Sequence, residues 1–154
     1  MKRTTITETV VFLFVILFLY TGISKIMEYT LFKEQLRESP ILGFAASFVA
    51  RWLPILEFLL AIMLVVPRWR LKGLYASTAL MAGFTIYIIV LMSIADHLPC
   101  SCGGVLAQLS WGQHIVFNCV FIALGITGII AERKIRRDAE AVWHNIGKEP
   151  NLNV

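Results

Sequence analysis

Two cysteines separated by one residue, in the run Cys100-Ser101-Cys102-Gly103-Gly104, are the residues of this chain best suited to chemistry. A disulfide between Cys100 and Cys102 closes a small, strained ring, and strain makes a disulfide labile and easily exchanged. The glycines that follow give the backbone freedom and leave space for a partner protein to approach the sulfur atoms. The pair therefore favours thiol-disulfide exchange, with two inert thiols or a local staple as the alternatives.

A metal site is the competing interpretation, because thiolates bind Cu(I) and zinc and because His97 and His114 bracket the pair. A structural zinc site normally shows two ligand pairs at short spacing, whereas each histidine here stands alone. We therefore predict no metal site and keep Cu(I) or zinc handling as a weaker alternative. His114 is expected either to hydrogen-bond at the membrane surface or to stabilise a thiolate and move a proton during exchange.

A third cysteine, Cys119, lies five residues beyond His114, which places it about 7 to 8 Å further along a helix. A lone cysteine in an apolar segment usually packs as a small buried hydrophobe. Hydrocarbon surroundings also suppress the thiolate form that exchange requires. We therefore expect Cys119 to be inert, and a role as a third redox thiol is the alternative.

A carboxyl group within an apolar segment, Glu57, requires a partner, because burying one in a membrane costs on the order of 3 kcal/mol. Arg51 is six residues earlier, on a different helical face, so Lys25 and Asn118 are the candidate partners. Pro54 should bend this helix beside Glu57 and open a polar pocket. Glu57 is then either a tether between helices or a group that accepts protons or contacts a quinone.

The elements that must position these residues are membrane helices, because 58% of the 154 residues are apolar and only 16% are charged. At roughly 20 apolar residues per span, the chain holds one all-α membrane domain of four helices. The spans are expected at about 6–26, 43–66, 71–95 and 111–131, followed by a tail at 132–154.

Three shorter features join these spans. Residues 28–39 predict a short amphipathic helix at the membrane surface, ended by Pro40. Residues 96–110 form a loop that carries the cysteine pair. Ser110 and Gln113 match a capping box, so the fourth span should begin near Trp111.

Basic residues indicate the orientation of the spans, since cytoplasmic loops are enriched in Lys and Arg. The predicted outer side has four basic residues, largely offset by acidic neighbours. The predicted cytoplasmic side has Lys2, Arg3, Arg68, Arg70, Lys72, Arg133, Lys134, Arg136 and Arg137. Both termini are therefore expected in the cytoplasm and the cysteine loop in the bacterial periplasm, an oxidising compartment. The net charge of +4 indicates topology and not nucleic-acid binding.

The chain resembles the DoxX-like superfamily and, within it, the MauE family of redox-associated membrane proteins, over roughly residues 10–131. The resemblance rests on three blocks: Tyr20-Thr-Gly-Ile-Ser-Lys25, Leu53-Pro-Ile-Leu-Glu57, and Pro99-Cys-Ser-Cys-Gly-Gly104 with Leu109-Ser-Trp111 and His114 to Asn118. It implies a four-helix bundle in the inner membrane that works beside a periplasmic thioredoxin-like protein to form or maintain disulfides of exported proteins. It implies no methylamine metabolism.

Two function classes follow from these residues. The first is a thiol-disulfide redox protein that uses Cys100 and Cys102, supported by His97, His114, Arg51, Glu57, Lys25 and Asn118. The second is a non-catalytic subunit of a membrane complex, in which the cysteine pair is a staple. Membrane disulfide oxidases of the DsbB type relay through two cysteine pairs, whereas this chain has one pair plus Cys119. The sequence therefore specifies no cofactor and argues against quinone as the final acceptor.

Overall fold

The structure is a computed structural model that describes residues 2–94 and 110–146, so His97, Cys100 and Cys102 lie outside the described residues. Every element in the described part is helical. The helices are α1 (Lys2–Met27), α2 (Tyr29–Glu38), the 3₁₀ turn Gly43–Ala45, α3 (Ala46–Val65), α4 (Arg70–Ile94) and α5 (Trp111–Ile146). The predicted all-α class is confirmed.

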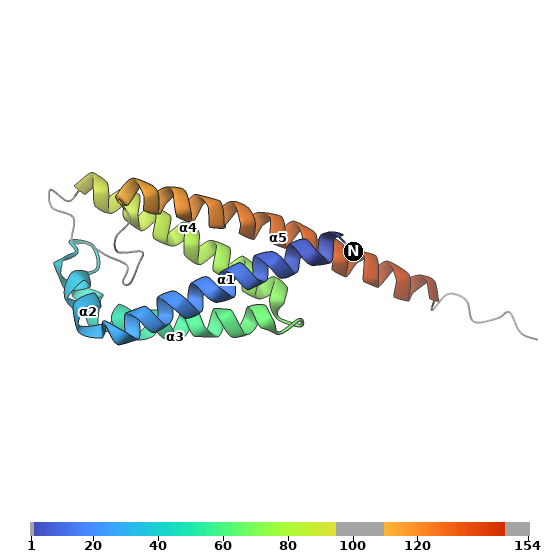
Figure 1. Ribbon diagram of the computed structural model, residues 1–154, viewed down its shortest axis with the longest axis horizontal. Coiled ribbons are helices and arrows are strands. Elements are labelled where there is room, and N and C mark those ends of the chain that lie inside the picture. The colour runs from blue at the N-terminus through green and yellow to red at the C-terminus, as the bar shows by residue number, and fades with distance from the viewer. Residues whose placement is uncertain (1, 95–109, 147–154) are drawn as a thin grey trace, which may run out of the picture.

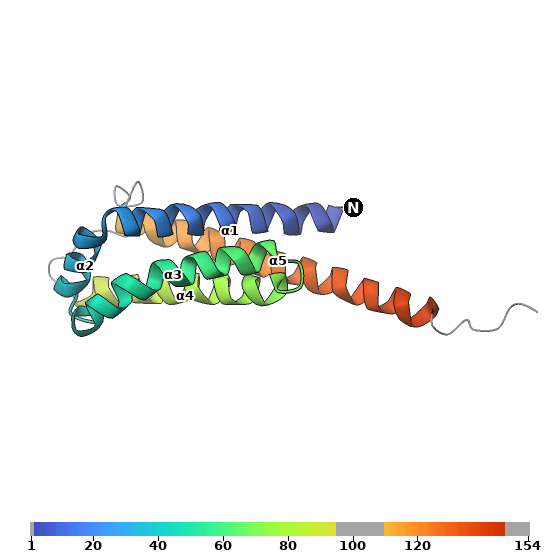
Figure 2. The ribbon, with the colours of Figure 1, turned by 90° about the horizontal axis from the view of Figure 1, so that it is seen from below.

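Four of these helices are long and apolar enough to cross a membrane, over Arg3–Met27, Gly43–Val65, Arg70–Ile94 and Trp111–His144. They form an elongated bundle in which α1 packs against α3 and α5, and α4 packs against the same two helices (Figure 1). The two views at right angles show that α2 lies at one end of the bundle and the N-terminus at the other (Figure 2). The predicted number and order of spans are therefore confirmed.

The bundle interior is packed with large apolar side chains. Phe14 and Phe18 of α1 meet Leu64 of α3 and Leu74 of α4, and all four are almost fully buried. Gly73 permits this packing, because a Cβ there would lie 3.1 Å from the backbone nitrogen of Leu64. Many other apolar side chains lie on the outside, among them Phe12, Trp52 and Ile86. An apolar exterior is suited to lipid and not to water.

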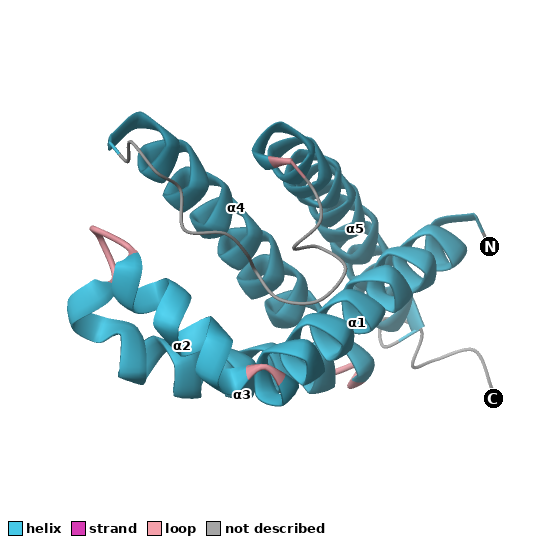
Figure 3. Cartoon of the chain, turned by 60° about the vertical axis from the view of Figure 1, so that its left-hand side comes forward, coloured by secondary structure: helices cyan, strands magenta, loops and turns pink. Residues whose placement is uncertain are grey.

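Helix α2 is amphipathic and packs on the start of α3 (Figure 3). Its Phe32 and Leu36, four residues apart, are buried against Ala46 and Ala50 of α3. The helix ends at Glu38, before Pro40, which cannot continue it. The predicted short helix over 28–39 is thus confirmed to within one residue at each end.

Helix α5 begins at the predicted capping box. The Ser110 backbone N–H donates to Gln113 Oε1 at 2.9 Å, and the Gln113 N–H donates to Ser110 Oγ at 3.4 Å. The first part of the tail predicted at 132–154 continues the same helix as far as Ile146. Two contacts secure this extension: Arg136 donates to the Pro67 carbonyl at 2.9 Å, and Asp138 pairs with Arg3 at 3.1 Å.

Candidate functional site

A buried ion pair joins α1 to α3. Lys25 is in the last turn of α1, and its Nζ lies 2.8 Å from Oε1 of Glu57 in α3. Lys25 is 3% exposed and Glu57 1% exposed, so neither charge is reached by solvent. The prediction that Glu57 is buried with a polar partner from another span is confirmed. Each charge of such a pair compensates the other. Loss of either partner would leave one buried charge without compensation, which is strongly destabilising.

The pair has further contacts on α1 and α2. The Thr21 hydroxyl lies 3.1 Å from Glu57 Oε1 and 2.9 Å from the Leu17 carbonyl. Lys25 Nζ also lies 3.4 Å from the Thr21 carbonyl and sits 5.8 Å from the centre of the Phe32 ring. Glu57 Oε2 has no hydrogen-bond partner among the described residues. Among the described residues, the Glu57 carboxylate therefore accepts hydrogen bonds through Oε1 only.

Helix α5 adds two polar side chains one turn apart, His114 and Asn118. Residues four apart lie on one face of a helix, and here both are buried. Asn118 Nδ2 has no partner within the described part of the chain. A buried amide without a partner costs free energy, so its N–H groups are available to a further acceptor.

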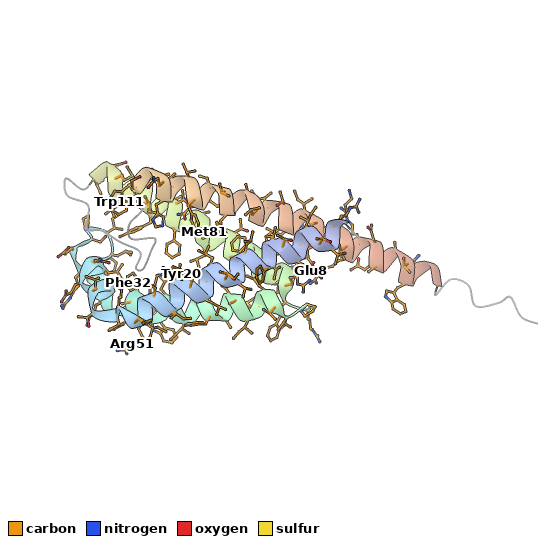
Figure 4. All side chains as sticks on the ribbon, viewed as in Figure 1. Glu8, Tyr20, Phe32, Arg51, Met81 and Trp111 are labelled. Carbon is orange, nitrogen blue, oxygen red and sulfur yellow. The ribbon has the colours of Figure 1, made fainter. Side chains whose placement is uncertain are left out.

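These side chains border one cavity of about 250 Å³ toward the α2 end of the bundle. Lys25, Glu57, His114 and Asn118 form part of its wall. The rest is mostly apolar: Leu17, Phe18, Thr21, Phe32, Leu36, Leu42, Val49, Leu53, Met81, Phe84, Tyr87, Ile88 and Phe117. Figure 4 shows Phe32 on α2 and Met81 on α4 within this part of the molecule. All five helices thus contribute to one mostly apolar pocket with polar side chains in its wall.

A hydrogen bond holds the corner between α2 and α3 onto α4. Ser39 Oγ and the Tyr87 hydroxyl are 2.9 Å apart, and the backbone N–H groups of Ile41 and Leu42 donate to Ser39 Oγ at 3.4 and 3.3 Å. Leu42 and Tyr87 both border the cavity. This bond therefore fixes one wall of the cavity to another.

The predicted supporting residues are only partly brought together. Lys25, Glu57, His114 and Asn118 meet at the cavity, whereas Arg51 is exposed, points away from the bundle, and does not join them (Figure 4). The helical spacing that separated Arg51 from Glu57 explains this difference.

The expectation that Cys119 packs as a buried hydrophobe is wrong. Its side chain is exposed on the outside of α5, next in sequence to the buried Asn118. The sequence argument used depth along the helix and could not tell which face the residue occupies. In a membrane this position contacts lipid, so hydrocarbon and not protein surrounds the thiol.

Sequence reasoning missed Thr21, Ser39, Tyr87 and Phe32 as members of the site. Thr21 had a usable signal, because it precedes Lys25 by one helical turn and shares its face. Ser39 and Tyr87 are 48 residues apart, and no local pattern links them. Across residues 2–94 and 110–146, no group of three or more His, Cys, Asp or Glu side chains could hold a metal ion.

These features define a multi-pass membrane protein, a four-helix bundle with a buried Lys-Glu pair and, toward one end, a mostly apolar cavity with polar side chains in its wall. The chain belongs to the family of methylamine utilisation protein MauE, which it matches over residues 3–131. That range includes every described residue of the cavity. Comparison with curated proteins and with solved structures gave no match. The resemblance to the MauE family is confirmed, and the wider DoxX-like relationship stays a prediction.

Proposed function

We propose that this protein is a thiol-disulfide redox protein of the bacterial inner membrane. It exchanges disulfides through Cys100 and Cys102 with a periplasmic thioredoxin-like partner during the maturation of exported proteins. One observation supports this proposal above the others. The end of α4 and the start of α5, which flank the cysteine segment in sequence, lie at the α2 end of the bundle, where the buried polar groups gather (Figure 1).

The reaction is a two-electron exchange. A thiolate of the reduced pair attacks a disulfide of the partner, forms a mixed disulfide and releases the partner's other sulfur as a thiolate. The second cysteine of the pair then attacks the mixed disulfide, closes the Cys100–Cys102 bond and releases the partner's remaining thiolate. The pair loses two electrons and two protons, and the partner disulfide gains them; the reverse direction follows the same steps.

His114 is the described residue best placed to assist this exchange. It is four residues after Ser110, hence about 6 Å along α5 from the point where the cysteine segment joins the helix. An imidazole can take up the proton that a thiol loses, and it can stabilise the thiolate that forms. His114→Ala should therefore slow exchange, although both cysteines are still present.

Methylamine itself is a poor candidate for a ligand, although the family is described by methylamine utilisation. Methylamine is a cation at neutral pH, and the buried carboxylate that could receive it is already paired with Lys25 at 2.8 Å. A second buried cation would lack a partner, which is costly in a membrane. The proposal therefore connects the chain to protein maturation and not to amine recognition.

Mixed-disulfide trapping tests the proposal. Of the variants Cys102→Ser and Cys100→Ser, the one that lacks the resolving thiol and keeps the attacking thiol should accumulate a covalent complex with a thioredoxin-like protein, detected by mass spectrometry after acid quenching. Cys119→Ser is the matched control, because it removes the thiol on the lipid-facing side of α5 and should leave trapping unchanged. The absence of any complex with either single variant, with normal growth and assembly, would contradict exchange.

Orientation is tested separately. In a Cys119→Ser background, a membrane-impermeant maleimide added to reduced spheroplasts should label Cys100 or Cys102. Labelling that requires permeabilisation would place the pair in the cytoplasm and overturn the proposed compartment.

A second candidate function is a non-catalytic subunit of a membrane complex. The observation that favours it is the Lys25–Glu57 pair, which joins α1 to α3 and could serve assembly alone. Glu57→Leu should lower the amount of assembled protein under either function, so the cysteine variants decide: in a non-catalytic subunit both should behave as wild type.

A further inference from the structure

Apart from His114, the side chains around the cavity beside the Lys25–Glu57 pair have no role in the thiol chemistry proposed above. None of its described wall residues is a cysteine. Its polar side chains nevertheless come from four helices, α1, α3, α4 and α5, and one of them has an unused donor. The cavity therefore requires an explanation of its own.

The unused hydrogen-bonding capacity favours a ligand that presents an acceptor oxygen. Asn118 Nδ2 is buried and unpartnered among the described residues. Lys25 Nζ carries three N–H donors, and its described hydrogen bonds are to Glu57 Oε1 and the Thr21 carbonyl. A carbonyl oxygen between these two side chains would receive hydrogen bonds that the protein otherwise leaves unmade.

The charge of the cavity favours a neutral ligand. Lys25 and Glu57 are its charged described residues, and their 2.8 Å contact cancels the two formal charges. An anion or a cation entering this space would be buried without a counter-ion. A neutral molecule avoids that cost.

The size and wall of the cavity favour a single ring. A dry cavity of about 150 Å³ is large enough to bind benzene, so about 250 Å³ accommodates a six-membered ring with substituents. Phenylalanine rings border it from four helices: Phe18 on α1, Phe32 on α2, Phe84 on α4 and Phe117 on α5. Aromatic walls favour flat, apolar ligands through stacked and edge contacts.

The surrounding helices are membrane spans, so the ligand must also dissolve in lipid. We propose that the cavity binds the head group of a membrane quinone, with one quinone carbonyl accepting hydrogen bonds from Asn118 Nδ2 and Lys25 Nζ. A quinone is neutral, flat, lipid-soluble and rich in carbonyl oxygen, which matches each property of the site. The protonated form of a fatty acid is neutral and has a carbonyl but lacks the ring, so it serves as the competing ligand.

Binding is measured with the full-length protein in lipid nanodiscs and with two radiolabelled probes, a ubiquinone and a menaquinone that each carry one isoprene unit. Empty nanodiscs give the partition into lipid, which is subtracted. Asn118→Leu removes the donor and keeps a similar volume, whereas Val49→Phe places a ring at the half-buried α3 wall. Ser77→Ala is the matched control, because Ser77 Oγ is also a buried polar atom without a described partner but lies outside the cavity wall.

The expected result is saturable binding of at least one probe to the wild type. Loss of the Asn118 donor should weaken that binding about tenfold, which is the usual effect of one hydrogen bond. Val49→Phe should weaken it at least as much, and Ser77→Ala should not change it. Circular dichroism establishes which variants are folded; should Asn118→Leu unfold, the comparison of Val49→Phe with Ser77→Ala decides.

Three results would overturn the proposal. The first is no saturable binding of either probe to folded wild type. The second is equal binding to wild type and Val49→Phe. The third is complete displacement of the quinone by an equal concentration of palmitic acid, which would identify a site for any apolar chain. Because no cysteine is altered, each result stands apart from the trapping experiment.

Discussion

Replacement of one member of the Lys25–Glu57 pair should destabilise the bundle more than replacement of both. Both side chains are buried and their charged atoms are 2.8 Å apart, so a single replacement leaves one charge without compensation. Breaking a buried pair in this way costs about 3–5 kcal/mol. Lys25→Met and Glu57→Leu should therefore each lower the free energy of unfolding by that amount, and the double variant should be close to wild type.

Glu57→Gln provides an intermediate case. The amide oxygen can still accept hydrogen bonds from Lys25 and Thr21, but the charge is gone, so we expect a loss of about 1–3 kcal/mol. Glu34→Leu on the exposed side of α2 is the control and should stay within about 0.5 kcal/mol of wild type.

Equilibrium unfolding of the full chain in mixed micelles, followed by circular dichroism, measures these values as a double-mutant cycle. Two single losses of about 3–5 kcal/mol and a double variant close to wild type correspond to a coupling free energy of about 6 kcal/mol or more between the two sites. Effects of Lys25→Met and Glu57→Leu that add to within about 0.5 kcal/mol would refute the reasoning, because they would show that the residues do not sense one another.

Three further predictions follow from other contacts. Tyr87→Phe removes the hydrogen bond to Ser39 and should lower the free energy of unfolding by about 1 kcal/mol; an unchanged value would mean that this bond does not hold the corner. Ser110→Ala removes the hydroxyl that accepts a hydrogen bond from the Gln113 N–H and should lower the free energy of unfolding by about 1 kcal/mol. The amides in the first turn of α5 should then exchange hydrogen faster than in the wild type, and an unchanged exchange rate there would argue against this role. Gly73→Ala places a methyl group 3.1 Å from backbone atoms and should cost about 1–3 kcal/mol in the unfolding assay. Gly83 is on the same helix, but a Cβ added there would meet open space, so Gly83→Ala should be neutral or stabilising. Equal losses of stability in the two glycine variants would contradict the packing argument.

The helices could be predicted from the sequence because membrane spans depend on local composition. Runs of about 20 apolar residues and the Ser110–Gln113 box are read without knowledge of any distant contact. Helix α2 also has a local signal, since Phe32 and Leu36 recur at helical spacing. Each of these elements lies close to its predicted bounds.

The site was predicted only in part, because its members come from different helices. Glu57 was recognised by its cost in an apolar span, and that cost implied a partner such as Lys25. The cost says nothing about which faces of the other helices meet Glu57. Arg51 shares α3 with Glu57 but not its face, and it is exposed. The cavity itself depends on how five elements leave space between them, and no pattern along one helix contains that information.

The length of α5 has a mechanical consequence. Its 36 residues form one uninterrupted helix of about 54 Å, well beyond the roughly 30 Å of hydrocarbon that a span must cross. A helix without a break moves as a rod, so a tilt that shifts its extension also shifts His114 and Asn118 at the other end. Because Arg136 and Asp138 hold the extension to the α3–α4 turn and to α1, such a tilt must be shared with those elements. The cavity wall contributed by α5 is thus mechanically linked to the opposite end of the bundle.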